Sequence, residues 1–227
     1  MSILKDIICL ANSRKSGGFC FAGKELRRGK PVKWIRPVSS REDEEISQHE
    51  YQYEDGSFPQ LLEIITVPLL EPKPKGCQQE NWLFNPDYYW RKIGVLGKKD
   101  LNQFIDPEEL LWINGHKTYN GINDVIPFKL VDTLESSLRF IWVDHLNFYV
   151  YRPGESFGNP RKRLQGRFQH NKTTYRLWVT DPLYEKRYLA KPEGEYEIGE
   201  SFLTISIGGF KERDELYKLI AAIIELG

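Results

Sequence analysis

The first 70 residues consist of short apolar segments separated by turn-forming residues, and this spacing constrains the fold more than any other feature. Strands are predicted at residues 3–11, 19–23 and 32–38, and a fourth at 61–70 after a polar excursion. Apolar runs of this length bounded by Gly, Pro, Asn and Ser are typical of strands. The residues therefore predict a small, mainly β domain built from short strands.

Three strands, an excursion and a fourth strand is the order found in a five-stranded Greek-key barrel of OB type. Many small barrels share that order, so the spacing leaves other barrels open. Strand patterns return from residue 138, with a hairpin predicted between 161–169 and 173–180 and a further strand at 202–207. The chain thus shows two runs of strands, over residues 1–75 and 134–227.

The segment between these two runs, residues 76–133, reads as a mixed helical and irregular connector. Helices are predicted at 86–96 and 100–111. A closing amphipathic helix is predicted at 215–226, because Leu216, Leu219, Ile220 and Ile223 fall at helical spacing. Lys218, in the same segment, is interpreted as a solvent-exposed cation.

The formal net charge is 0, from 32 basic and 32 acidic side chains, but the charges are segregated. Residues 1–41 hold 10 basic and 2 acidic residues, and residues 151–191 hold 10 basic and 3 acidic residues. The intervening residues 42–58 hold 7 acidic and no basic residues. Solvated faces that neutralise each other are one interpretation, and two local surfaces facing a polyanion are the other.

Several classes of protein are disfavoured by composition. No apolar run approaches the length of a membrane helix, and no signal peptide is recognised, so a cytoplasmic protein without membrane contact is predicted. Three cysteines without paired spacing argue against disulfides and zinc. No catalytic or metal-binding motif is found among the histidines and carboxylates, so no cofactor, metal or catalytic residue is predicted.

The first basic stretch offers two candidate binding elements. Its first turn, between two predicted strands, combines polar and basic residues with two glycines that would let backbone amides approach a phosphate: Asn12, Ser13, Arg14 and Lys15. A solvated hairpin turn is the alternative. Trp34 and Arg36 lie two apart on one predicted strand face, where an indole could stack on a base and a guanidinium could pair with a phosphate. A core tryptophan beside a snorkelling arginine is the alternative.

The second basic stretch interleaves arginines with aromatic residues, which is typical of a groove with stacking platforms. Its candidate ligand contacts are Arg161, Arg163, Arg167, Arg176 and Trp178. Thr180 and Asp181 are added as residues that could orient Arg176 or a ligand. A strand-ending turn in which Asp181 accepts hydrogen bonds from nearby amides is their simpler interpretation.

These residues together resemble the dual OB-containing domain family. The resemblance rests on residues 10–15 (LANSRK), 17–23 (GGFCFAG), 34–39 (WIRPVS), 61–67 (LLEIITV), 175–182 (YRLWVTDP), 203–208 (LTISIG) and 217–222 (YKLIAA). It implies two OB-type barrels packed in one unit, and a bacterial nucleic-acid-binding module associated with mobile-element and defence genes. It brings no established catalytic residues, and residues 77–126 match no part of the family pattern.

The sequence therefore predicts a non-enzymatic module that binds single-stranded or structured RNA or DNA. A sensor for a nucleotide or another small phosphorylated ligand is the alternative, with residues 12–18, 34–37 and 180–181 forming one pocket. An enzyme acting on nucleic acid, and an adaptor that docks a protein through the acidic residues 42–58, stay open as well.

Overall fold

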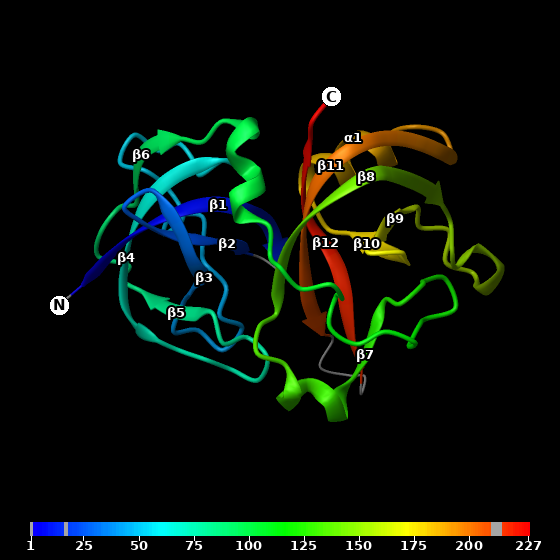
Figure 1. Ribbon diagram of the computed structural model, residues 1–227, viewed down its shortest axis with the longest axis horizontal. Helices are drawn as coiled ribbons and strands as arrows, with labels where there is room; N and C mark the ends of the chain where they lie inside the picture. Colours follow the sequence, from blue (N-terminus) through cyan, green and yellow to red (C-terminus); the bar gives the residue numbers. More distant parts are fainter. Residues whose placement is uncertain (1, 16–17, 210–214) are drawn as a thin grey trace. The chain divides into compact units, whose positions relative to one another are not determined.

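The computed structural model describes residues 2–15, 18–209 and 215–227, the side chains of Arg14 and Lys15 excepted (Figure 1). The chain divides into two compact units, each of which is described by itself. The first contains residues 1–104 and 135–137, and the second contains residues 105–134 and 138–227. The chain therefore passes from one unit to the other after residues 104, 134 and 137.

The first unit is a closed barrel. Strand β1 pairs antiparallel with β2 and β4, β2 pairs with β3, and β5 joins β3 in parallel and β4 antiparallel. The order β1-β2-β3-β5-β4-β1 is that of the OB barrel, and β6 extends the sheet from β4. The strands are β1 (Ile3–Lys15), β2 (Gly18–Arg27), β3 (Lys30–Val38), β4 (Glu63–Pro72), β5 (Asn81–Phe84) and β6 (Arg91–Val95).

Strand β1 pairs with two neighbouring strands because it bends. Its register with β2 shifts between Cys9 and Ala11, as a β-bulge does, and its first half pairs with β4. Gly23 makes the close approach possible, since a Cβ there would lie 1.8 Å from the carbonyl oxygen of Ile8. The core inside this barrel is rich in aromatic residues. Phe21 packs edge-on against Trp90, with 5.0 Å between the ring centroids.

The second unit repeats the strand order of the first. Strand β8 pairs with β9 and β11, β9 pairs with β10, and β12 joins β10 in parallel and β11 antiparallel. The cycle β8-β9-β10-β12-β11-β8 is again that of the OB barrel, with β7 added beside β12. The strands are β7 (Val125–Pro127), β8 (Leu138–Tyr151), β9 (Arg163–His170), β10 (Thr173–Val179), β11 (Gly194–Gly209) and β12 (Glu215–Glu225). The prediction of a mainly β chain with two OB-type barrels is confirmed.

The predicted closing helix is wrong, because Glu215–Glu225 forms strand β12. Leu219, Ile220 and Ile223 do fall at helical spacing, but Ala221 and Ile224 are buried with Ile220 and Ile223 and leave no polar face. A strand that is buried on both faces reads as a near-continuous apolar run, and β-branched isoleucines favour it.

The two α-helices predicted within residues 76–133 are also absent. Residues 91–95 pair with β4 as strand β6, and only a 3-10 helix at Lys98–Phe104 lies in the second predicted span. Two further 3-10 helices cover Phe128–Thr133 and Glu155–Phe157. The segment is divided between the units, since 76–104 supplies β5 and β6 to the first and 105–133 supplies β7 to the second.

The α-helix α1 (Pro182–Leu189) lies between β10 and β11, where the sequence predicts only a turn. Pro182 is pre-set for the first helical position, and Asp181 caps the helix by accepting hydrogen bonds from the Leu183 and Tyr184 amides. The second oxygen of Asp181 accepts from the Ile223 amide on β12 at 3.1 Å. Asp181 thus joins the helix to the sheet, and the structural interpretation of this residue is supported.

Replacing Asp181 with alanine should lower the free energy of unfolding of the second unit by about 2–4 kcal/mol. The change removes the cap and leaves the buried Ile223 amide without its acceptor. Urea unfolding of Asp181→Ala would measure it, with Asp132→Ala, an exposed carboxylate on a 3-10 helix, as the matched control. Equal losses in the two variants would show that Asp181 does not hold the helix to β12.

Candidate nucleic-acid interface

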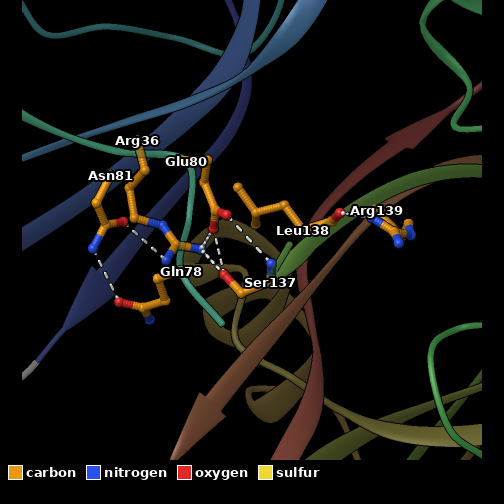
Figure 2. Close-up of polar contacts among 7 residues, drawn as sticks. All are labelled: Arg36, Gln78, Glu80, Asn81, Ser137, Leu138 and Arg139. Carbon is orange, nitrogen blue, oxygen red and sulfur yellow. Dashed lines mark hydrogen bonds and ion pairs between the residues drawn. The ribbon is translucent and has the colours of Figure 1, made fainter. Parts of the chain in front are cut away.

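Arg36 does not face solvent, contrary to the prediction that it contacts phosphate. It is 5% exposed and forms an ion pair with Glu80 at 3.1 Å (Figure 2). It also donates to the Ser137 hydroxyl at 2.9 Å and, at the long distance of 3.5 Å, to Asn81, which in turn donates to Gln78. Ser137 itself donates to Glu80 through both its hydroxyl and its amide. Arg36 is therefore the centre of a buried polar cluster within the first unit.

Trp34 is likewise unavailable to a base. Its side chain is 7% exposed, and the ammonium of Lys24 lies 5.4 Å from its ring centroid. Lys24 is itself buried and donates to the Phe104 carbonyl at 2.8 Å. Both residues are therefore buried, which the local sequence pattern does not reveal.

The turn that was predicted to approach a phosphate is only partly described. Asn12 donates to the Pro59 carbonyl at 2.6 Å, and Ser13 is half-buried in β1 opposite Cys20. The side chains of Arg14 and Lys15, together with residues 16–17, lie outside the described residues. The structure accordingly assigns Asn12 to packing of the barrel and leaves the role of the two cations a prediction.

The outer face of β8, β9 and β10 in the second unit brings the other candidates together. Residues that pair directly across antiparallel strands share one face of the sheet. One row of this face is Asn147, Arg167 and Arg176, and the next is Tyr149, Gln165 and Trp178. Tyr151 and Arg163 form a third row. The opposite face of these strands is the apolar core of the barrel.

Arginines and aromatic rings form one continuous series of contacts on this outer face. The Arg163 guanidinium lies 4.8 Å from the Trp178 ring, and Trp178 stacks on Tyr151 at 6.2 Å. The Arg176 guanidinium lies 5.3 Å from the Tyr151 ring and 4.5 Å from the Tyr149 ring. We call these five residues the cation–aromatic ladder: Tyr149, Tyr151, Arg163, Arg176 and Trp178.

The ladder is held in place by contacts at its base. The Tyr151 hydroxyl donates to Gln165 at 2.6 Å, and Gln165 donates to the Asn120 carbonyl. The backbone of Arg176 exchanges hydrogen bonds with Ile122 in both directions. Burial raises the pKa of Tyr151, although Arg176 and Arg163 act to lower it. Fixed rings and flat guanidinium groups lose little freedom on binding, which favours contact with an anion.

Tyr149 and Tyr151 are the residues that the sequence analysis did not select. Their signal was present, since both alternate with the buried Phe148 and Val150 on β8 and therefore face outward. What the sequence could not supply was the register that places them beside Arg163 and Arg176.

Four further candidates belong to the same unit as the ladder. Arg167 and Arg161 are exposed, and Arg161 and Arg163 both act on the carboxyl of Glu185, whose pKa is nevertheless raised by burial. Thr180 donates through its amide to the Ile220 carbonyl at 2.8 Å, so it fastens the end of β10 to β12. Asp181 is buried in its helix cap. None of these hydrogen bonds joins Thr180 or Asp181 to a residue of the ladder.

Lys218 is buried, contrary to the prediction of a solvent cation. Its ammonium donates to the Ile113 carbonyl at 2.6 Å and to the Asn114 side chain at 3.1 Å, and it lies 5.4 Å from the Tyr175 ring. Burial lowers the pKa of Lys218 to about 7, against the opposing charge of Asp124. Lys218 thus holds the segment before β7 onto the second barrel.

The acidic residues 42–58 have cationic partners in their own unit. The carboxylate of Glu44 lies 3.7 Å from the ammonium of Lys73 and 3.3 Å from that of Lys75. The Arg41 guanidinium donates two hydrogen bonds of 2.7 Å to the carboxylate of Glu50. These contacts neutralise part of the segment within the first unit.

No cluster of three or more His, Cys, Asp or Glu side chains in the described part of the chain could hold a metal ion, and no helix among those residues is long and apolar enough to cross a membrane. Cys9, Cys20 and Cys77, all of them described, form no disulfide.

Two barrels with the same OB strand order, one of which carries a basic and aromatic sheet face, define a dual OB protein of a nucleic-acid- or ligand-binding fold. A family model described as the dual OB-containing domain matches residues 5–223. The chain belongs to this family. Searches of curated proteins and of solved structures give no significant match.

Proposed function

We propose that this protein binds single-stranded or structured nucleic acid through the cation–aromatic ladder of its second barrel. The observation that carries the proposal is the ladder's position on the outer face of β8, β9 and β10. In OB barrels the face of the second and third strands is the one that takes oligonucleotides, and here those strands are β9 and β10. The bacterial and defence-associated setting rests on the family resemblance alone, and the cytoplasmic location rests on the composition of the sequence.

The ladder suggests how binding would work. Each ring is already stacked on a guanidinium group or another ring, so the rings act mainly to orient Arg163 and Arg176. A guanidinium that lies flat on a ring keeps its N–H edges available for phosphate oxygens. Contacts of this kind read the backbone rather than the bases, so affinity should depend little on sequence.

Fluorescence anisotropy with labelled RNA and DNA oligomers of about 12 nucleotides tests the proposal. With four arginines near the face, affinity for a single strand should fall roughly 50-fold between about 50 and about 200 mM salt. The double variant Arg163→Gln/Arg176→Gln should lose most of this binding and most of its salt dependence. Arg187→Gln, on α1, is the matched control and should bind like the parent.

The result that overturns the proposal is also clear. It fails if neither RNA nor DNA is retained at low salt, or if the double variant and the Arg187 variant bind equally well. Circular dichroism of each variant would show that the barrels remain folded.

The nucleotide-sensor alternative is left without three of the side chains that the sequence analysis assigned to its pocket. Trp34, Arg36 and Asp181 have partners within their own units. A small phosphorylated ligand would need other side chains.

A further inference from the structure

A polar hollow of about 320 Å³ opens at the end of the ladder, in the second unit. Arg167, Asn147, Gln169 and Thr174 line it and provide guanidinium, amide and hydroxyl donors, and Tyr149 links it to the ladder. Arg167 is exposed and belongs to β9, whereas Thr174 lies on β10 directly opposite Gln169. The hollow thus gathers donors from three adjacent strands.

Arg167, which lines the hollow, lies directly beside Arg176 on the neighbouring strand. Arg167 and Arg176 are direct cross-strand neighbours, an arrangement that is destabilising for like charges. Within residues 2–15, 18–209 and 215–227, neither takes part in an ion pair that the structure shows. The Nε atom of Arg176 is buried and has no hydrogen-bond partner. An anion between the two guanidinium groups would remove this cost.

Carboxylates also lie near these donors. Asp144 lines the hollow, and Glu197 lies opposite Asn147 on the neighbouring strand β11. A nucleic-acid backbone that continued past Arg167 would bring its next phosphate toward these acids. The charge pattern therefore suits the end of a strand better than its middle.

The donors suit a phosphate monoester in particular. A monoester carries more negative charge than a diester and has three terminal oxygens that accept hydrogen bonds. Arg167 can donate two parallel bonds to such a group, and Asn147, Gln169 and Thr174 can serve the remaining oxygens.

We infer that this hollow binds the phosphate monoester at the end of a nucleic-acid strand whose backbone lies along the ladder. The inference rests on the proposed function, because the ladder holds the rest of the strand. A free mononucleotide carries the same chemical group, so the experiment separates the two sources.

Competition binding would use one oligomer sequence in three forms, with a 5′-phosphate, with a 3′-phosphate or with hydroxyl groups at both ends. One phosphorylated form should bind about tenfold more tightly than the hydroxyl form. Arg167→Gln should abolish this preference, so that the three oligomers bind with equal affinity. Thr174→Val should reduce the preference, and Arg187→Gln should leave it intact.

The outcomes distinguish the inference from the proposed function. Equal binding of all three oligomers overturns the inference and leaves the ladder as a backbone-binding face. In a third outcome, an adenosine monophosphate probe binds, Arg167→Gln removes that binding, and no oligomer binds. This outcome supports a monoester site and overturns the proposed binding of a nucleic-acid strand. No binding of any oligomer or mononucleotide overturns both.

Discussion

Raising the pH from about 7 to about 9 should increase the free energy of unfolding of the second unit by roughly 2–3 kcal/mol, and Lys218→Met should lose most of that increase. Burial lowers the pKa of Lys218 from 10.5 to about 7 in the folded protein. The unfolded chain keeps the ordinary value, so it binds more protons than the folded state across this window. The stability that Lys218 contributes at alkaline pH is therefore lost as the pH falls toward 7.

The groups around Lys218 favour its charged form, but burial outweighs them. Asp124 is the opposing charge, Tyr175 presents its ring, and the Ile113 carbonyl and Asn114 amide oxygen accept the protons of the amine. A neutral amine can still donate to both oxygens, so deprotonation relieves the cost of burial without breaking the contact.

Two measurements would check this prediction. Urea unfolding across the pH window should show the increase in the parent and in Lys186→Met, an exposed lysine on α1, and a nearly flat profile in Lys218→Met. Carbon-13 NMR of labelled lysines should show one amine that titrates near pH 7 and is missing from Lys218→Met. A titration in which every lysine stays near its ordinary pKa would contradict it.

Arg36→Met should lower the free energy of unfolding of the first unit by about 3–5 kcal/mol, because it leaves the buried Glu80 carboxylate without its counter-charge. Ser137 would still donate to Glu80, but two neutral donors do not replace a guanidinium. The large effect comes from stranding a charge and not from the strength of the ion pair itself.

A second variant separates these two effects. In Arg36→Met/Glu80→Gln the stranded charge is gone and the amide oxygen can still accept from Ser137, so at least half of the loss should be recovered. Arg41→Met breaks the more exposed contact with Glu50 and should cost only about 1 kcal/mol or less. If the double variant is as unstable as Arg36→Met, lost packing rather than buried charge explains the effect.

Local patterns were sufficient for most strands within residues 1–70 and 138–207 and for the two faces of β10. Tyr175, Leu177 and Val179 alternate there with Arg176 and Trp178, and the first set is buried whereas the second is half-buried. The order of the first strands fits an OB barrel but left other small barrels open, and the family resemblance distinguished it from them.

Contacts between distant residues account for the errors. The local sequence around Arg36 does not reveal Glu80 and Ser137, which the fold places beside it. The local sequence around Lys218 likewise does not reveal its hydrogen bond to Ile113. The prediction for the final strand was wrong for a different reason. An apolar run such as residues 219–224 satisfies both helical and strand periods, and only its pairing with β10 and β11 decides between them.

The threefold passage of the chain between its two units has a consequence for where the chain can be divided. Every strand of the first barrel precedes residue 105 and every strand of the second follows it, but residues 135–137 belong to the first unit. A fragment ending at residue 134 would lack Ser137, and one beginning there would lack β7 and the Ile113 partner of Lys218. A fragment ending at residue 104 would hold all six strands of the first barrel and still lose the hydroxyl that binds Arg36 and Glu80.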